Sequence, residues 1–536
     1  MAASPTTIGV SATVAASRWK RPNAPWMPAL VVLLVYGAIL IGYLASGHDA
    51  RDFIRIGQRF VLRSHASAVI QYDPHYAYMA DNTGNDGQFA YYLALDPANA
   101  RYYMDYPSYR YTRILYPLAA RVLAFGQAGL IPYTLLLVNL LAVAGGTLAL
   151  AAWLRSRGCS PWLALLFGFY PGVAVVLQRD LTEVLAYALV ALAVYLYDFG
   201  GRWAPLWAGL AFAAATLSRE TAALFPIVYG LALLLRAPAT EIAPAGVLKD
   251  GRTTASRVSA QRWATAALRR VRANWWRAAL LLATALAPFA AYKLFLFAWL
   301  GDFGTRPDLA PHLVPFSGLF FLWPWQYQQI IVVVAVIVPA LTCAAMALWA
   351  LARRAWTVGI WSLLLNLQVL VVMLAPTSYF IYSGTGRITT GVIVAVLLAV
   401  PTFDALTGGN RGWLIACAAW WLLGIPAVTA VALLLHMPLR DVSVGGVALA
   451  VALPLPMLSW RRWGGASLYR RASVAGRAKG ADSASSSRKL SSSRNMSASS
   501  AGRRRKSASS PLAARVCASA ARPSASRIAA SARGRM

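Results

Sequence analysis

Acidic and cationic side chains that could catalyse group transfer gather in the segment 47–129. Asp49 and Asp86 are carboxylates of the kind that act as a general base on an acceptor hydroxyl. Arg110 and Arg113 could bind the oxygens of a departing phosphate, because the planar guanidinium group binds phosphate in a bidentate way and stays charged. The segment therefore holds the residue types needed to transfer a group from a phosphate leaving group to a hydroxyl.

Further charged side chains stand outside this segment. Arg219 and Glu220 lie between two short apolar runs, and Arg387 lies between two others. A charged pair within a membrane is costly, so an ionisable residue there predicts a functional site. We predict that Arg219 and Arg387 contribute to phosphate binding, with Glu220 beside them. Asp52 is a third candidate base after Asp49 and Asp86.

A purely structural interpretation of these residues stays open. The carboxylates and arginines can form salt bridges that organise the loop. Asp86 and Gly87 can form a turn, since Gly adopts positive φ and Asp tolerates turn positions. Asp180 and Glu183 stand where a predicted helix begins, and acids there favour the helix dipole, so capping explains them as well. Arg219 can likewise serve as a cap or in an ion pair.

The composition is that of a membrane protein. The 536 residues are 59% hydrophobic and 13% charged, a balance that water-soluble domains do not normally carry. The apolar residues come in blocks of roughly 17 to 25, the length at which a helix crosses a bilayer core. We therefore predict an all-α polytopic protein whose transmembrane domain spans 27–460, with about twelve helices. The expected helices are 27–46, 130–153, 161–177, 182–199, 204–217, 222–236, 278–299, 328–351, 356–376, 388–406, 412–435 and 443–459.

The formal net charge of +32 indicates topology. Most of it lies in the segment 1–26, in the loop 237–277 and in the tail 461–536, which the positive-inside rule places in the cytoplasm together with both termini. We predict that the tail, rich in Ser, Ala and Arg, is disordered and contacts anionic lipid headgroups. No specific nucleic-acid partner is expected.

The segment 47–129 is expected to be a large helical extracytoplasmic loop. It combines acids, arginines and many tyrosines, a composition unlike that of disordered linkers. The apolar spacing from Tyr116 to Phe125 predicts a short amphipathic helix at the interface. His48, Asp49 and Asp52 do not have zinc-ligand spacing, so no metal is expected. The chain has no Walker loop, dinucleotide Gly pattern, nucleophile elbow or Cys/His array.

Several motifs carry a resemblance to a known family. They are Gly47-His48-Asp49, Asn85-Asp86-Gly87-Gln88-Phe89-Ala90-Tyr91-Tyr92, Leu95-Asp96-Pro97, Tyr109-Arg110-Tyr111-Thr112-Arg113-Ile114-Leu115-Tyr116-Pro117, Asp180-Leu181-Thr182-Glu183 and Ser218-Arg219-Glu220-Thr221. Together they resemble a family of uncharacterised bacterial polytopic membrane proteins. That family is similar to the GT-C class of glycosyltransferases, which use polyprenyl-phosphate sugar donors. The resemblance covers the chain up to about residue 235.

The resemblance implies a membrane-embedded transferase of the bacterial inner membrane. It implies an acidic residue near the membrane surface as the general base, for which Asp49 fits best and Asp86 second. Arg110, Tyr111 and Arg113 would then contact the substrate. The lipid-linked sugar is the donor substrate and no separate cofactor is implied. Membrane lipids and a glycan, lipid or protein acceptor are the implied partners.

Two other classes of function remain open from the residues. A secondary transporter or lipid-carrier flippase also has about twelve helices with both ends inside, and it predicts ionisable residues or broken helices near the midplane. A non-catalytic envelope assembly protein needs no carboxylate base, so it predicts tolerance to loss of Asp49 and Asp86.

Overall fold

The computed structural model describes residues 24–62, 84–235, 260–304, 314–323, 327–371, 376–380, 382–408, 412 and 420–422. These residues form helices and connecting turns and contain no β-strand, which confirms the all-α prediction for this part of the chain. The predicted tail 461–536, the span 443–459, most of the span 412–435 and the segment 1–23 lie outside the described residues.

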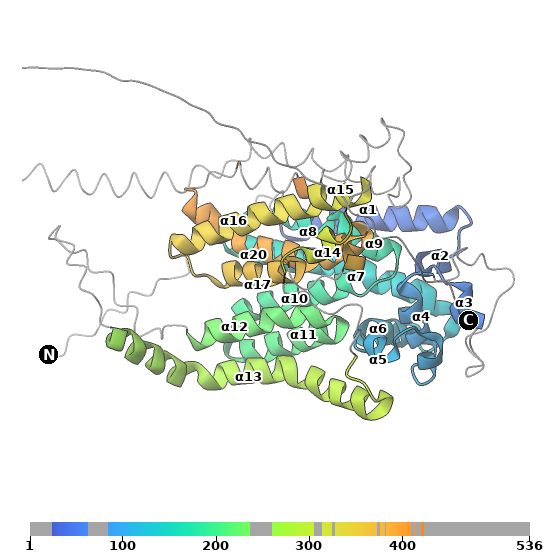
Figure 1. Cartoon of the computed structure of the whole chain (residues 1–536), viewed down its shortest axis with the longest axis horizontal. Coiled ribbons are helices and arrows are strands. Elements are labelled where there is room, and N and C mark those ends of the chain that lie inside the picture. The colour runs from blue at the N-terminus through green and yellow to red at the C-terminus, as the bar shows by residue number, and fades with distance from the viewer. Residues whose placement is uncertain are drawn as a thin grey trace, which may run out of the picture. The chain divides into compact units, whose positions relative to one another are not determined.

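The helices follow one another along the chain in three groups (Figure 1). The first group is α1 (Trp26–Ala45), α2 (Arg51–Ile54), α3 (Gln58–Leu62), α4 (Gly87–Leu95), η2 (Ala100–Tyr103), α5 (Pro107–Tyr111), α6 (Leu115–Leu123), η3 (Ala128–Leu130) and α7 (Ile131–Ser156). The second group is η4 (Pro161–Ala164), α8 (Leu165–Gly168), α9 (Pro171–Gln178), α10 (Glu183–Phe199), η5 (Gly201–Trp203), α11 (Ala204–Ser218), η6 (Glu220–Ala223), α12 (Leu224–Leu234) and α13 (Ala260–Leu300). The third group is α14 (Ser317–Phe320), α15 (Tyr327–Val332), η9 (Val333–Ile337), α16 (Val338–Ala352), α17 (Val358–Val371), α18 (Pro376–Tyr379), α19 (Tyr382–Ile388) and α20 (Thr390–Leu406).

Several of these helices are long and apolar enough to cross a membrane. Four pass by length and composition: Trp26–Ala45, Ala128–Ser156, Leu268–Leu300 and Gln328–Ala352. Two bent pairs, α8 with α9 and α19 with α20, raise the number to six if each pair is one span. Helices occupy the other expected spans up to residue 408, but they are shorter. The coarse membrane assignment is thus supported, while the count of twelve stays a prediction.

Helix α13 is longer than the sequence predicted. The prediction placed a helix at 278–299 after a basic loop, whereas the helix begins at Ala260 and runs for 41 residues. The apolar criterion marks only the part of a helix that suits hydrocarbon, while Ala, Leu and Arg extend a helix readily beyond it. At 1.5 Å per residue, α13 exceeds the roughly 30 Å of a bilayer core.

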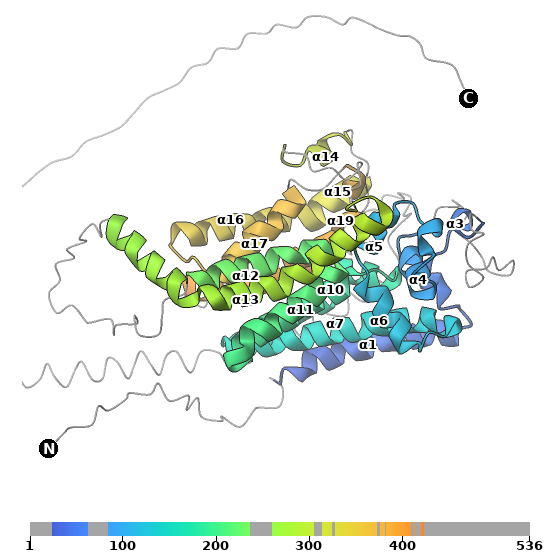
Figure 2. The same ribbon diagram turned by 90° about the horizontal axis from the view of Figure 1, so that it is seen from below.

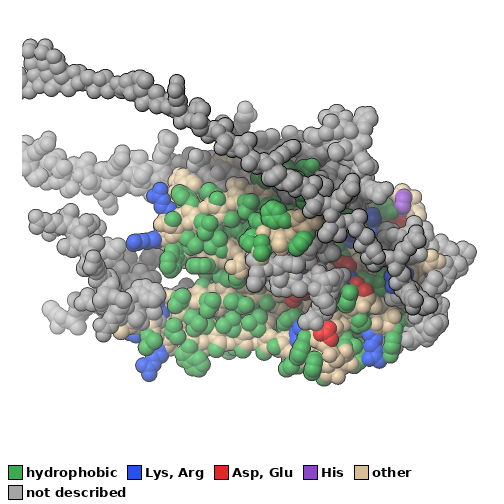
Figure 3. Space-filling model, in the orientation of Figure 1, with side chains coloured by type: hydrophobic (Ala, Val, Ile, Leu, Met, Phe, Trp, Pro, Cys, Tyr) green, Lys and Arg blue, Asp and Glu red, His purple; other side chains and the backbone are tan. Residues whose placement is uncertain are grey.

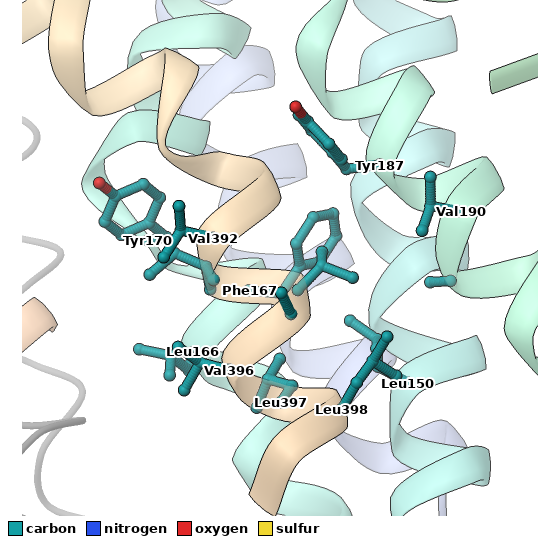
Figure 4. Close-up of a cluster of buried hydrophobic side chains, with 14 of the residues drawn as sticks. Leu150, Leu166, Phe167, Tyr170, Tyr187, Val190, Val392, Val396, Leu397 and Leu398 are labelled. Atoms are coloured by element: carbon teal, nitrogen blue, oxygen red, sulfur yellow. The ribbon is translucent and has the colours of Figure 1, made fainter. Parts of the chain in front are cut away.

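The main core is built by α7, α8, α10 and α20. Figure 4 shows a cluster of its buried side chains, from these helices and from Tyr170 directly before α9: Leu150, Leu166, Phe167, Tyr170, Tyr187, Val190, Val392, Val396, Leu397 and Leu398. Small residues let the helices approach closely, because a Cβ on Gly146 would lie 2.8 Å from the Cβ of Ala188. Small residues at helix contacts are typical of membrane proteins, where close backbone packing stabilises helix pairs.

A second core joins the short helices α2 to α6. It buries Tyr92, Tyr103, Tyr111 and Tyr116, and it packs against α7 and α13. Figures 1 and 2 both place these short helices at one end of the long ones. The helix predicted from Tyr116 to Phe125 is confirmed as α6. The described parts of the segment 47–129 are therefore a packed helical unit, as expected.

Side-chain types are distributed unevenly over the bundle. On the face shown in Figure 3, hydrophobic side chains cover the long helices, Lys and Arg lie at both ends, and Asp and Glu lie toward the end with the short helices. A wide apolar band between two charged ends suits a protein that crosses a bilayer.

Candidate functional site

Two close backbone contacts assemble a cluster of charged residues at the end with the short helices. A Cβ on Gly87 would lie 2.1 Å from the carbonyl oxygen of Arg179, so only glycine lets α4 begin against the turn between α9 and α10. A Cβ on Gly172 would lie 2.2 Å from the carbonyl oxygen of Gly386, which brings α9 equally close to α19. These contacts bring the start of α4, the α9–α10 turn and α19 together around one point.

Asp86 lies directly before α4 and is held between two arginines. Arg110 Nη1 is 2.9 Å from Asp86 Oδ1, and Arg387 Nη2 donates to Asp86 Oδ2 over 2.6 Å. Burial alone would raise the pKa of Asp86, but the guanidinium groups of Arg110 and Arg387 outweigh it and hold that pKa well below its usual range. Asp86 is therefore ionised at neutral pH.

Arg110 is the most constrained of the cations. Its side chain is 7% exposed, and its Nε and Nη2 donate to Asp105 over 2.8 and 2.7 Å. The guanidinium carbon also lies 4.2 Å from the ring centre of Phe89, within cation–π range. Arg110 is thus fixed by α4 and α5 together.

Two further ion pairs flank Asp86. Arg113 donates to Glu220 through Nη2 over 2.7 Å and through Nε over 3.1 Å, a bidentate pair between the α5–α6 connection and η6. Arg219 Nη1 donates to Glu183 Oε1 over 2.6 Å, with both side chains buried. Arg387 Nε lies 3.7 Å from the same Glu183 oxygen, so it links this pair to Asp86.

Asp180 completes the cluster from the turn after α9. Leu181 N donates to Val176 O over 3.1 Å, and Asp180 has φ +48°, so α9 ends in a Schellman motif with Asp180 at the left-handed position. Asp tolerates this conformation better than most residues. The turn directs the Asp180 side chain inward, where it is fully buried.

A small cavity lies among these groups. It has a volume of about 30 Å³, enough for water but not for a sugar. Its lining combines charged groups with apolar side chains of α4: Asp86, Phe89, Ala90, Leu93, Arg110, Arg113, Asp180, Leu181, Thr182, Glu183 and Arg387. Buried polar atoms without a hydrogen-bond partner in the described part of the chain surround it, among them Asp180 Oδ2, Glu183 Oε2 and Thr182 Oγ1.

The structure brings most of the predicted site residues together. Asp86, Arg110, Arg113 and Arg387 line the cavity, and Arg219 and Glu220 bind groups at its edge. Within the segment 47–129, Arg110 forms salt bridges with Asp86 and Asp105, as the structural interpretation predicted. Glu220 and Arg387 join this cluster from parts of the chain that are far away in sequence.

Three predicted residues lie elsewhere. Asp49 pairs with its neighbour Arg51 at 2.8 Å, is 41% exposed and does not line the cavity. Tyr111 donates its hydroxyl to Pro97 O over 2.6 Å and packs edge-on against Trp299, so it holds the short helices together. Asp52, the third candidate base, accepts hydrogen bonds from Tyr43 and the Asp49 backbone.

Sequence reasoning missed three acids of the cluster as site residues. Asp180 and Glu183 were part of a recognised motif but were explained equally well as caps. Glu183 does stand in the first turn of α10, where it favours the helix dipole, and it also pairs with Arg219. Asp105 was not singled out, although it stands five residues before Arg110 and binds it. The sequence signal that could have found Asp105 is its position a few residues before a candidate arginine, Arg110.

The arrangement can bind an anion beside an ionised carboxylate. Its arginines present guanidinium groups that suit phosphate oxygens, and Asp86 can accept a proton. Comparison of the chain with protein families, curated proteins and solved structures gives no match. The function therefore has to be inferred from the geometry.

Proposed function

We propose that this protein is a membrane-embedded glycosyltransferase that moves a sugar from a polyprenyl-phosphate donor to an extracytoplasmic acceptor. The observation that supports it is Asp86 between Arg110 and Arg387, beside a cavity at one end of the apolar helices. A lipid-linked donor would keep its polyprenyl tail in the bilayer and present its phosphate at this boundary. The proposal includes the bacterial inner membrane, about twelve spans and cytoplasmic termini.

The arginines would exchange partners when donor binds. With no donor present, Asp86 is a weak base because two guanidinium groups neutralise it. Donor phosphate would draw Arg387 away, since the Arg387 side chain is less enclosed than that of Arg110. This movement would enlarge the cavity and make Asp86 more basic at the same time.

The chemical step would follow from that state. The acceptor hydroxyl oxygen forms a bond to the anomeric carbon of the sugar, and its proton passes to Asp86. The bond between the anomeric carbon and the phosphate oxygen breaks, and polyprenyl phosphate leaves with the electron pair. Arg110, Arg113 and Arg387 would stabilise the charge that develops on the leaving phosphate.

A lipid-carrier flippase or transporter is the second candidate. Two bent helix pairs, α8–α9 at 48° and α19–α20 at 41°, both reach the charged cluster. Broken helices at a site of ionisable residues are a feature of transporters. The same cluster would then bind a lipid phosphate without breaking a bond.

An assay of purified full-length protein in liposomes distinguishes these functions. The liposomes contain a polyprenyl-phosphate sugar and a mixture of acceptors. We would compare wild type with Asp86→Asn, Asp49→Asn and the matched control Asp198→Asn, whose carboxylate pairs with Arg157 at the other end of α10. Mass spectrometry of donor and products is the readout. Loss of transfer in Asp86→Asn of roughly 10²-fold or more supports the proposal.

The other outcomes are equally informative. Transfer lost only in Asp49→Asn moves the base to Asp49. Donor that crosses the bilayer without being consumed supports the flippase. Neither transfer nor crossing, in protein that inserts normally, contradicts both candidates and favours a non-catalytic role.

A further inference from the structure

Asp180 is the one acid lining the cavity that forms no ion pair among the described residues. Its side chain is fully buried, and Oδ2 has no hydrogen-bond partner. Oδ1 lies 3.3 Å from the hydroxyl of Tyr116, whose single proton also faces Leu135 O at 3.1 Å. A buried carboxylate that lacks a cationic partner and has few hydrogen-bond donors is unfavourable in its charged form. Such a group becomes neutral by taking up a proton.

The cations around the cavity do not compensate Asp180. Arg110 pairs with Asp86 and Asp105, and Arg387 pairs with Asp86. The remaining pairs are Arg113 with Glu220 and Arg219 with Glu183. Each of these arginines already has a carboxylate partner, so an ionised Asp180 would add a surplus negative charge to a buried cluster.

The groups around Asp180 come from every element packed against it. They are Tyr116 and Asn139 on α6 and α7, Glu183 on α10, Asp86 before α4, Arg110 and Arg113 from α5 and the connection after it, Arg387 on α19, and its own neighbour Arg179. The two that hydrogen-bond its carboxyl group, Tyr116 and Asn139, are neutral. The nearby acids Asp86 and Glu183 oppose ionisation of Asp180.

We infer that Asp180 carries a proton at neutral pH and donates it, as an Oδ2–H hydrogen bond, to a phosphate oxygen of the lipid-linked substrate. A protonated carboxyl group is a hydrogen-bond donor that adds no negative charge, which suits an anionic ligand better than a carboxylate does. The proton is a property of Asp180 itself, while the phosphate partner rests on the proposed function. Burial raises the pKa of the Asp180 carboxyl well above its ordinary value, and hydrogen bonds from Tyr116 and Asn139 only partly oppose this.

Infrared difference spectroscopy tests the proton directly. Full-length protein in lipid nanodiscs at neutral pH should show the carbonyl band of a protonated carboxylic acid that disappears in Asp180→Asn and persists in Asp86→Asn. If Asp180→Asn does not fold, Asp180→Glu should keep the band and shift its frequency. Absence of a band assignable to Asp180 overturns the inference, whatever the enzyme activity.

Ligand addition tests the phosphate partner. Polyprenyl phosphate without sugar should move the Asp180 band to lower frequency, because the O–H group then donates to an anion, and neutral polyprenol should not. Inorganic phosphate, added in place of polyprenyl phosphate, shows whether the phosphate group alone is recognised. A shift of the Asp180 band with either compound supports the inference. No shift with either phosphate compound overturns this part.

Binding gives a second readout. Asp180→Ala should weaken binding of polyprenyl phosphate roughly tenfold or more, and Asp180→Asn, which keeps a donor, should weaken it less. Equal binding by wild type and Asp180→Ala contradicts the donated hydrogen bond. A shifted band and weakened binding in a protein that transfers no sugar would keep this inference and overturn the transferase function.

Discussion

Asp86 and Arg387 stand 301 residues apart in the chain and are joined by a hydrogen bond of 2.6 Å. The bond connects the start of α4 with α19, and Arg387 also approaches Glu183 of α10. A ligand that competes for Arg387 would therefore weaken its contacts with both Asp86 and Glu183. This link is the basis of the first prediction.

If the protein transfers sugar as proposed, Arg387→Gln should lower the rate at limiting donor by roughly 10²-fold, because a cation proposed to bind the leaving phosphate is lost. The loss should appear in kcat/KM for the donor and not in KM for the acceptor. Steady-state kinetics in liposomes measures it, with Arg157→Gln as the control that removes the partner of Asp198. Unchanged donor kinetics would remove Arg387 from the site.

Gly87→Ala should destabilise the protein by roughly 1 to 3 kcal/mol, because the added Cβ would lie 2.1 Å from Arg179 O and force α4 away. The displacement should also separate Asp86 from Arg387. Thermal unfolding of the full chain in detergent measures the loss. Gly145→Ala on α7 is the matched control, since its Cβ meets nothing within 4 Å, and an equal effect of both substitutions would contradict the steric reason.

Glu183→Gln should destabilise the protein by about 3 to 5 kcal/mol, because it leaves Arg219 charged and buried without its partner. The double variant Glu183→Gln with Arg219→Gln should be more stable than the sum of the two single changes predicts. A double-mutant cycle of unfolding free energies gives this coupling. Additive losses would mean that the two side chains do not interact.

The pH dependence of stability should reveal Asp180. Its folded-state pKa is raised above the unfolded value of about 4, so its contribution to stability is complete below that value and is lost as the pH rises toward the folded pKa. Within this window the stability of wild type relative to Asp180→Asn should fall by up to about 1.4 kcal/mol per pH unit.

Asp86 should behave in the opposite way, because its folded-state pKa is lowered. Its contribution is present above the unfolded pKa and is lost as the pH falls through the folded value. Unfolding of wild type, Asp180→Asn and Asp86→Asn across a pH series measures both slopes. Parallel curves for the two variants would contradict the different charge states of the two acids.

Much of the fold follows from local sequence. Apolar blocks predict helices because a chain in hydrocarbon must satisfy its backbone hydrogen bonds internally, and helices are found at those blocks up to residue 408. The helices in the described parts of the segment 47–129, and Asp86, Arg110 and Arg113 as candidate residues, could also be predicted, because acids, arginines and aromatic residues stand out in an apolar chain. The start of α13 at Ala260 could not be predicted, since its first turns hold charged residues that the apolar criterion leaves out.

Tertiary structure decided which acids share a site. Asp49 and Asp86 look alike in sequence, but only Asp86 meets Arg387, whose approach depends on helix packing and not on spacing. A turn at Asp86 and Gly87 was one open interpretation of the sequence; Gly87 begins helix α4, and its close contact with Arg179 is visible only in the folded chain. The sequence by itself determined the helices and the candidate residues, because both depend on local composition. Only the tertiary structure decided their partners, and with them the charge states of Asp86 and Asp180, because burial and pairing arise from segments distant in the chain.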